Sequence, residues 1–376
     1  MRLTRLLLIL SAVILSGCSQ LNKASDYITN PTAKEVYKRD FNLSDSLFTK
    51  WKNQVEIALN DSIQVELPYA EKGKFLPRIF PVYSYEIELN PGELFNLEIE
   101  TDSLKELVFI DVFKRTEDSL NPFTKVESAE FGAKHFAFEA EKEGKYKVVI
   151  QPAIEGNSPF LLKMIKSPVY LFPVASYSNS AVQSFWGAQR DGGARSHEGI
   201  DIFAERGTPV VAATSGRITY TGEKGLGGKQ VWLRDSRRGQ SLYYAHLDSI
   251  NPVSGRVKVG DTLGFVGNTG NARTTPPHLH FGIYKNFQGA INPLNFVFMP
   301  EPLNLDEVED NIPHKILTKA VTANLRNKPT TSGSKIIGSS KAQDTLQILG
   351  KSRDWYHIRT RENKASFIHQ SLVKPI

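Results

Sequence analysis

The sequence is poor in the features that would place it among disulfide-rich, membrane-spanning or nucleic-acid-binding proteins. It has one cysteine, Cys18, so no disulfide can form within the chain. Its clearest apolar run, residues 6–15, is shorter than the roughly 20 residues that a spanning helix needs. No nucleic-acid-binding motif is present. With 40% hydrophobic and 23% charged residues, the composition indicates a globular chain of several domains.

The N-terminus has the pattern of an export signal. Arg2 and Arg5 precede the apolar run, as in secretory signal peptides. The sequence Leu-Ser-Gly-Cys at residues 15–18 resembles the bacterial lipoprotein processing box, which implies cleavage before Cys18 and lipidation of that cysteine. The alternative is an ordinary signal peptide with an incidental cysteine. We expect residues 1–17 to be a lipoprotein signal peptide and residues 18–39 to be a tether.

Residues 40–168 are predicted to form a β-sandwich-like domain. An amphipathic pattern at residues 44–60 predicts one helix, which Ser44 could cap. Apolar alternation then predicts strands around residues 85–89, 95–99, 108–112, 136–138 and 146–150, with turn residues between them. Short strands at this spacing indicate a sandwich of jelly-roll type.

Candidate catalytic residues gather between residues 196 and 284, which hold four of the eight histidines. They form three blocks: His197 to Asp201, Tyr244 to His246, and His278 to His280. Two imidazoles and a carboxylate suit a divalent metal, and catalytic zinc commonly takes three protein ligands and leaves a fourth position to water. The three blocks can supply such a set and leave two imidazoles for proton transfer.

The spacing within the blocks has a geometric interpretation. On a strand, His278 and His280 point to one face about 6–7 Å apart, while Leu279 points into the core. His197 and Asp201 can converge through a bend at Gly199 or on one side of a helical turn. The apolar residues around Asp201 favour a bend followed by a strand. Each residue alone has an ordinary alternative, since a lone histidine is commonly structural and Asp201 could cap a turn.

The order of these blocks resembles that of the lysostaphin-type (LytM-like) zinc endopeptidases, which cut peptidoglycan cross-links. The flanking segments at residues 185–187, 207–213, 216–218, 259–261 and 264–270 agree, and the resemblance covers residues 181–297. It implies that His197, Asp201 and His280 hold one zinc ion and that His246 and His278 form an unligated catalytic pair.

The resemblance implies hydrolysis by a metal-activated water. His278 is our first choice for the base that takes the proton of the water. His246 would orient the oxyanion or protonate the leaving amine, with Tyr244 as a possible substrate-binding helper. The residues alone leave open which histidine performs which step.

The C-terminal residues 314–376 are predicted to form a small β domain after a linker at residues 298–313. Their alternating segments resemble a bacterial SH3-like barrel, and such modules commonly bind wall peptides. The sequence departs from that pattern at residues 365–368, where a glycine-plus-aromatic step is expected. We interpret Trp355 as a core residue, and His357 and His369 as ordinary strand or turn residues.

The chain is therefore expected to be a mainly β, multidomain protein of the bacterial cell envelope, exported and lipid-anchored to a membrane. Its predicted function is zinc-dependent hydrolysis of peptide bonds in peptidoglycan stems or cross-links. One alternative is a non-catalytic envelope adaptor that binds the wall and activates other wall hydrolases, with its site blocked by the sandwich. Another is wall binding through the C-terminal barrel alone. The sandwich could bind glycan, gate the site or space it from the membrane.

Overall fold

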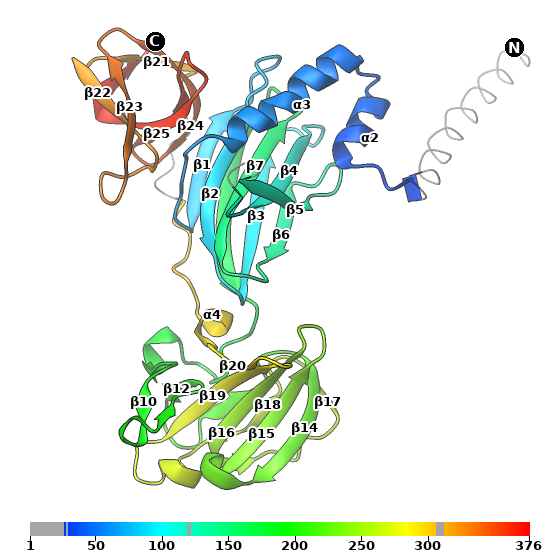
Figure 1. Ribbon diagram of the computed structural model, residues 1–376, viewed down its shortest axis with the longest axis vertical. Helices are drawn as coiled ribbons and strands as arrows, with labels where there is room; N and C mark the ends of the chain where they lie inside the picture. Colours follow the sequence, from blue (N-terminus) through cyan, green and yellow to red (C-terminus); the bar gives the residue numbers. More distant parts are fainter. Residues whose placement is uncertain (1–25, 28, 119–121, 306–311) are drawn as a thin grey trace, which may run out of the picture.

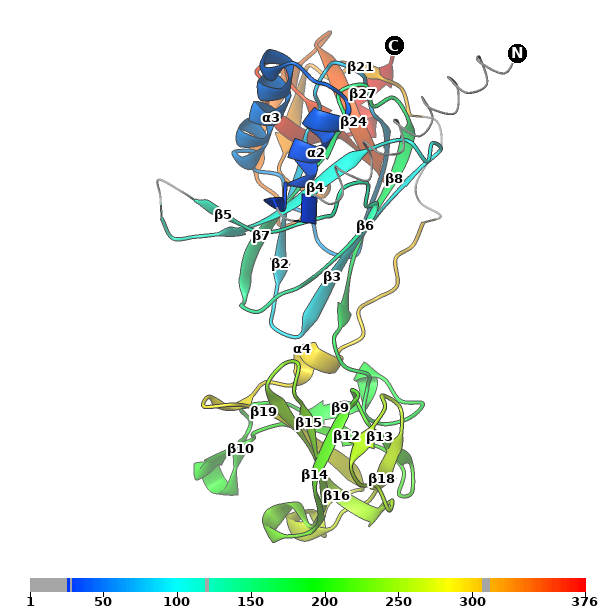
Figure 2. The ribbon, with the colours of Figure 1, turned by 90° about the vertical axis from the view of Figure 1, so that its right-hand side faces the viewer.

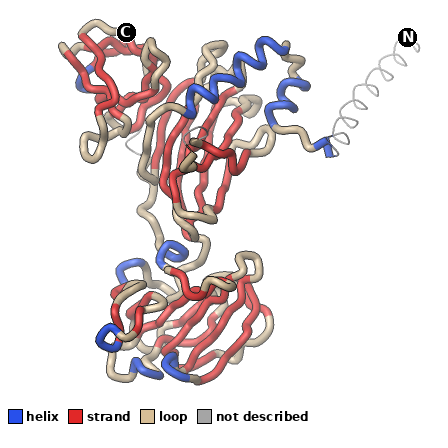
Figure 3. The backbone as a smooth tube through the Cα atoms, in the orientation of Figure 1, coloured by secondary structure: helices blue, strands red, loops and turns tan. Residues whose placement is uncertain are grey.

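The computed structural model describes residues 26–27, 29–118, 122–305 and 312–376, and most of its regular structure is β-strand (Figures 1 and 3). The mainly β, multidomain fold class is thereby confirmed. The predicted signal peptide, Cys18 and the start of the tether lie outside the described residues. Among the helices of the described part, none is long and apolar enough to cross a membrane.

The helix predicted at residues 44–60 is present as α3 (Asp45–Leu59). Ser44 caps it, because its hydroxyl accepts a hydrogen bond from the backbone N–H of Leu47 at 3.4 Å. The buried face includes Trp51 and Val55, as predicted. The Trp51 indole N–H donates to the carbonyl of Pro152 at 2.9 Å, which ties the helix to the sandwich.

A second helix, α2 (Ala33–Asp40), lies in the segment expected to be a tether. Its Tyr37 is 2% exposed and packs against Trp51 and Phe109. The tether prediction is therefore wrong for residues 33–39. One buried aromatic side chain in a short polar segment is too weak a periodic signal to predict such packing.

In the sandwich a four-stranded sheet faces four strands of a larger, eleven-stranded sheet (Figure 2). The first has the order β2 (Tyr83–Leu89), β7 (Gly144–Pro152), β4 (Val108–Arg115), β5 (Phe123–Ser128). The second has the order β1 (Tyr69–Lys74), β8 (Pro159–Pro168), β3 (Glu93–Thr101), β6 (His135–Glu139). The alternation seen in the sequence places apolar side chains of both sheets in one core.

The second sheet continues into the C-terminal barrel, because β1 pairs with β24. The barrel consists of β21 (Lys315–Thr318), β22 (Thr322–Arg326), β23 (Ile336–Lys341), β24 (Thr345–Ser352), β25 (Trp355–Arg359), β26 (Ala365–His369), the turn η5 (Gln370–Leu372) and β27 (Val373–Pro375). At the junction Gly73 lies opposite Gly350. A Cβ on Gly350 would come within 2.2 Å of Glu71, so the close pairing requires glycine there.

A buried polar cluster lies at this junction. Nδ1 of His357 is 3.0 Å from Glu71 Oε1, and both side chains are fully buried. The hydroxyls of Tyr69 and Tyr85 donate to the other oxygen of Glu71 at 2.5 and 3.0 Å. His357 lies on a strand, as predicted, but its contact with Glu71 was not predicted, because Glu71 lies 286 positions earlier in the chain and no local spacing indicates it. Trp355 is a core residue, as predicted.

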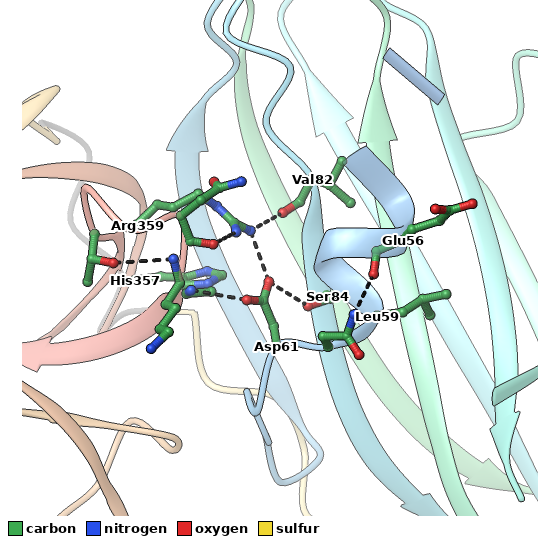
Figure 4. A network of polar contacts seen from close by, with 12 residues as sticks. Glu56, Leu59, Asp61, Val82, Ser84, His357 and Arg359 are labelled. Atoms are coloured by element: carbon green, nitrogen blue, oxygen red, sulfur yellow. Dashed lines mark hydrogen bonds and ion pairs between the residues drawn. The ribbon is translucent and has the colours of Figure 1, made fainter. Parts of the chain in front are cut away.

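Asp61, which follows α3, makes a second polar link between sandwich and barrel (Figure 4). Its carboxylate accepts from Arg359 at 3.0 Å, from the backbone N–H of Ala365 at 3.1 Å and from Ser84 at 3.3 Å. Arg359 also donates to the carbonyl of Val82 at 2.9 Å. Both the Glu71 cluster and the Asp61 link involve buried groups, so the barrel is packed firmly on the sandwich.

The central unit, residues 169–298, is built on a ten-stranded antiparallel sheet (Figure 1). Its main path is β17 (Arg256–Val257), β14 (Gly216–Glu223), β15 (Lys229–Asp235), β16 (Gln240–Ile250), β19 (His278–Lys285), β12 (Ile200–Phe203), β9 (Val182–Ser184). Beside this path lie β13 (Pro209–Val211), β18 (Thr262–Val266) and β20 (Gly289–Ile291). A separate hairpin pairs β10 (Gln189–Arg190) with β11 (Arg195–Ser196). The short helical elements are η1 (Asn179–Ala181), η2 (Asp191–Gly193), η3 (Gly225–Gly227), η4 (Gly270–Ala272) and α4 (Leu294–Val297).

The central unit contacts the end of the sandwich at which the chain leaves β8 and enters the central unit (Figure 2). Arg238 makes a bidentate ion pair with Glu139 of β6, with N–O distances of 2.7 and 2.9 Å. Phe296 of α4 packs on Gly92, where a Cβ would come within 2.5 Å of its ring. This joint is away from the histidines of the central unit.

Candidate active site

Two neighbouring strands position the candidate ligands. β12 pairs with β19 so that Asp201 lies opposite His280 and Ile202 opposite Leu279. Ile202 and Leu279 are fully buried in the core beneath. The bend followed by a strand is therefore observed. Gly199 is required at the bend, since a Cβ there would come within 2.7 Å of the His280 ring.

One possible ligand atom of each side chain points to a common position in His197, Asp201 and His280. His197 Nε2 lies 3.0 Å from Asp201 Oδ1 and 3.0 Å from His280 Nδ1. Asp201 Oδ1 in turn lies 3.0 Å from His280 Nδ1. Among the described residues these three side chains form the one cluster with the geometry of a metal site.

The tautomer of His197 makes this cluster suited to a cation. Its Nδ1 lies 2.9 Å from the carbonyl oxygen of Phe185, which accepts only, so that nitrogen carries the proton in the neutral ring. The lone pair of Nε2 then faces the carboxylate oxygen of Asp201. Lone pairs that converge in a buried site repel one another unless a cation lies between them. Two imidazole nitrogens and one carboxylate oxygen are a donor set that fits a divalent metal such as zinc.

Arg190 supports two of the candidate ligands from the hairpin. Its guanidinium donates to Asp201 Oδ2 at 2.6 Å and to the hydroxyl of Ser184 at 2.7 Å. Ser184 Oγ also lies 3.4 Å from His197 Nδ1. One oxygen of Asp201 thus binds Arg190, while the other faces the imidazoles. No pattern in the sequence identifies Arg190, because its role depends on a hairpin that brings it to Asp201 of β12.

His246 and His278 lie beside this cluster with their ring centroids 5.1 Å apart. His246 Nδ1 is 2.9 Å from the carbonyl of Thr269, and His278 Nδ1 is 2.9 Å from that of Pro276. Each neutral ring therefore keeps its proton on Nδ1 and has an unprotonated Nε2. Two proton acceptors accordingly lie next to the candidate metal site.

Tyr244 does not belong to the site, so its assignment as a substrate-binding residue is wrong. The side chain is fully buried in the core, and its oxygen accepts from the backbone N–H of Ala213 at 3.0 Å. Residues 244 and 246 would share a face in a regular strand. At His246 the backbone has φ +63°, and the strand pairing shifts register next to it, so the two side chains separate. Tyr243 lines the cleft instead.

Burial and charge shift the pKa values of the site. Burial lowers the pKa of His246 to about 4, helped by repulsion from His278 and His280. Burial also lowers the pKa of His280. For Asp201 burial acts to raise the pKa, but hydrogen bonds with His197 and His280 outweigh it and hold that pKa well below its ordinary value. The fold thus favours a neutral His280 beside an ionised Asp201, which is the protonation state that metal ligands need.

The cluster opens into a cleft of about 650 Å³. Its lining includes all four histidines and Asp201, with Arg190, Tyr243 and Tyr284 around them. Every described residue that lines it lies between positions 184 and 284. No described part of the sandwich or the barrel covers the cleft, so the structure does not favour an adaptor whose site is blocked by the sandwich.

Comparison with known proteins identifies two domains. The model of Peptidase family M23 matches residues 195–293, and that of the Bacterial SH3 domain matches residues 321–374. Over 137 residues the chain is 38% identical to the DD-carboxypeptidase/endopeptidase Mpg of Neisseria meningitidis, covering 36% of this chain and 31% of that protein. It is also 36% identical over 126 residues to the L-Ala–D-Glu endopeptidase of Bacillus subtilis, covering 31% and 38%. The chain thus spans about a third of the length of these curated relatives.

A solved structure also matches the chain. It is that of the catalytic domain of the antimicrobial peptidase lysostaphin from Staphylococcus simulans, at 34% sequence identity. The match covers 30% of this chain and 89% of that one, with a TM-score of 0.28.

Proposed function

We propose that this chain, which carries a peptidase family M23 domain and a bacterial SH3 domain, is a zinc-dependent endopeptidase that hydrolyses peptide bonds in peptidoglycan stems or cross-links. The observation that carries the proposal is the convergence of His197, Asp201 and His280 within 3.0 Å of one another, beside two further imidazoles. The relatives that are named endopeptidases support the reaction class.

His197 Nε2, Asp201 Oδ1 and His280 Nδ1 would hold the zinc ion. When bound, zinc supplies Lewis acidity that lowers the pKa of water and polarises a carbonyl. Arg190 binds Oδ2 of Asp201 and so fixes which of its oxygens faces the ligand nitrogens. The backbone carbonyl of Phe185 fixes the tautomer of His197, as partners of ligand histidines commonly do.

His278 and His246 divide the proton transfers. His278 accepts the proton of the attacking water at its free Nε2. His246 is a weaker acceptor at neutral pH, because its pKa is lowered to about 4. The proton that His278 takes from the water must then reach the leaving amine. His246 can carry it, because a ring with a lowered pKa gives up a proton readily once it has received one at Nε2.

The proposal places the protein in the bacterial cell envelope, where peptidoglycan is its substrate. Export by the segment at residues 1–17 and lipidation of Cys18 would anchor it to a membrane there. The proposed organisation is a sandwich at residues 40–168, the endopeptidase at 181–297, a linker at 298–313 and the SH3-like domain at 314–376. The last of these would hold the chain on the wall.

The test is digestion of isolated sacculi by the purified protein, with and without a metal chelator. Release of peptide fragments that stops with the chelator and returns with added zinc supports the proposal. Mass analysis of the fragments identifies the bond that is cut. Hydrolysis that the chelator leaves untouched, or no hydrolysis at all, favours the adaptor function instead.

A further inference from the structure

An aromatic surface extends the floor of the cleft along the central sheet. It consists of Tyr220 on β14, Trp232 on β15, Tyr243 on β16 and Tyr284 on β19, and we call these four residues the aromatic platform. The ring centroids of Trp232 lie 4.5 Å from Tyr243 and 5.1 Å from Tyr284. Tyr243 lies 5.7 Å from the ring of His280, so the platform adjoins the candidate metal site.

Glycines give the platform its shape. A Cβ on Gly222 would come within 2.7 Å of the Tyr220 hydroxyl, and one on Gly282 within 3.2 Å of the Tyr284 ring. A Cβ on Gly227 would come within 1.8 Å of the Tyr243 hydroxyl. The tyrosine rings therefore pack flat against the sheet over glycine residues. This arrangement leaves one side of each ring facing the solvent.

The platform also has polar groups available to a ligand. Within the described chain, neither the indole N–H of Trp232 nor the hydroxyl of Tyr220 makes a hydrogen bond to a protein atom, and Tyr220 is 38% exposed. The Tyr284 hydroxyl donates to Glu198 at 3.3 Å, and Glu198 lines the cleft. Rings with polar tips, beside an exposed carboxylate, suit a ligand that has both an apolar face and hydroxyl groups.

We propose that the aromatic platform binds the glycan strand of the same wall polymer whose peptides enter the cleft. The inference rests on the proposed function, from which it takes peptidoglycan as the substrate. A pyranose ring presents a face of C–H groups that stacks on aromatic rings, while its hydroxyls reach Glu198 and the tyrosine hydroxyls. The four strands β14, β15, β16 and β19 are neighbours, and Tyr243 and Tyr284 lie 6.3 Å apart with Trp232 beside both, so the rings form one continuous surface on which a sugar can stack.

A peptide fits the platform less well than a glycan. An extended peptide gains most from a free strand edge, whereas the platform lies on a sheet face whose backbone groups are paired within the sheet. The carboxylates of a stem peptide need cations, but the charged group that Tyr284 contacts is the acidic Glu198. The platform and the metal site thus select the two halves of one polymer, the sugar and the peptide.

The test measures sugar binding apart from hydrolysis. The full chain is titrated with a soluble β-1,4-linked tetramer of N-acetylglucosamine by calorimetry, in the presence of a chelator. Trp232→Ala is expected to weaken binding by about tenfold, whereas Trp232→Phe keeps most of it. The matched control is Phe287→Ala, which removes a fully exposed aromatic residue of the same unit and should bind as the wild type does. Circular dichroism confirms that each variant is folded.

Two results would overturn the inference. In one, Trp232→Ala binds the tetramer as the wild type does, or the wild type does not bind it. In the other, Trp232→Ala weakens binding of a sugar-free stem peptide and leaves the tetramer unaffected, which makes the platform a peptide site. Hydrolysis of sugar-free peptide by the wild type is measured separately. A failure there contradicts the proposed function and leaves the sugar result standing.

Discussion

The guanidinium of Arg190 donates to Oδ2 of Asp201 at 2.6 Å, while Oδ1 of the same carboxylate faces His197 and His280. One side chain therefore sets the orientation of a candidate ligand without touching the metal position. Arg190 also reaches Ser184, next to His197. The contact makes Arg190 a positioning residue for the proposed zinc site.

Loss of this contact should weaken zinc binding. We expect Arg190→Gln to lower the zinc affinity by about 10- to 100-fold, because the partners of metal ligands contribute to this extent. Competition with a chromophoric chelator measures it. Arg206→Gln is the matched control, since Arg206 pairs with Asp248 on the surface of the same unit. An unchanged affinity in Arg190→Gln would show that Asp201 needs no such support.

The proposed ligands and the proposed catalytic pair should respond differently to substitution. His280→Ala removes a donor, so we expect both bound zinc and wall hydrolysis to be lost. His278→Ala keeps the donor set, so zinc should remain while turnover falls between about a hundredfold and ten-thousandfold. Metal content by mass spectrometry and peptide release from sacculi separate the two outcomes. Full turnover in His278→Ala would refute its role as the base.

Acidification should destabilise the protein through His246. Its pKa is lowered to about 4 in the fold from an ordinary 6.5, so between these values the unfolded chain binds more protons than the folded one. This contribution to stability is complete above about pH 6.5 and disappears as the pH falls through about 4, and over that whole range it amounts to roughly 3 kcal/mol. Urea unfolding with a chelator present, at pH 7 and at pH 4.5, measures the loss.

His246→Gln should show a smaller loss of stability between these two pH values than the wild type. The control is His135→Gln, because the side chain of His135 is 77% exposed and should leave the wild-type pH dependence intact. If His246→Gln loses as much stability on acidification as the wild type, His246 is not the group responsible.

The junction of sandwich and barrel should depend on the Glu71–His357 pair. Glu71→Ala leaves His357 buried without its partner, so we expect a loss of about 3–5 kcal/mol in the free energy of unfolding. Replacing both residues by leucine should recover much of that loss. Glu155→Ala is the control, since its pair with Arg78 is exposed and should contribute less than about 1 kcal/mol. Equal effects of Glu71→Ala and Glu155→Ala would contradict a structural role for the buried pair.

Removal of the barrel should disturb the sandwich as well. Leu349, Trp355 and Phe367 of the barrel belong to the same buried core as the sandwich strands. We expect deletion of residues 314–376 to lower the unfolding midpoint of the remaining chain, because it exposes part of that core. Differential scanning calorimetry of the truncated chain measures the shift. An unchanged midpoint would show that the two domains are stable independently.

Local patterns in the sequence predicted much of the fold and the site. The alternation of apolar residues located five of the eight sandwich strands, and Ser44 with the apolar spacing located α3. The histidine blocks identified five side chains that the structure brings together. Each of these signals lies within a few residues of the chain, where periodicity and motif spacing are informative.

The features that the sequence did not predict depend on irregular backbone or on distant partners. Tyr244 was expected to help bind the substrate next to His246, but the left-handed backbone at His246 separates the two side chains. Arg190 acquires its role from the hairpin, and His357 from a glutamate in another domain. The aromatic platform draws one residue from each of four strands, so no short segment of the sequence displays it.

Anomalous diffraction at the zinc absorption edge tests the central claim most directly. We predict a single strong peak in crystals of the zinc-loaded protein, in contact with His197, Asp201 and His280, and its loss in His280→Ala crystals. A peak at another position, or none between these three side chains, would contradict the zinc site and the endopeptidase function that depends on it.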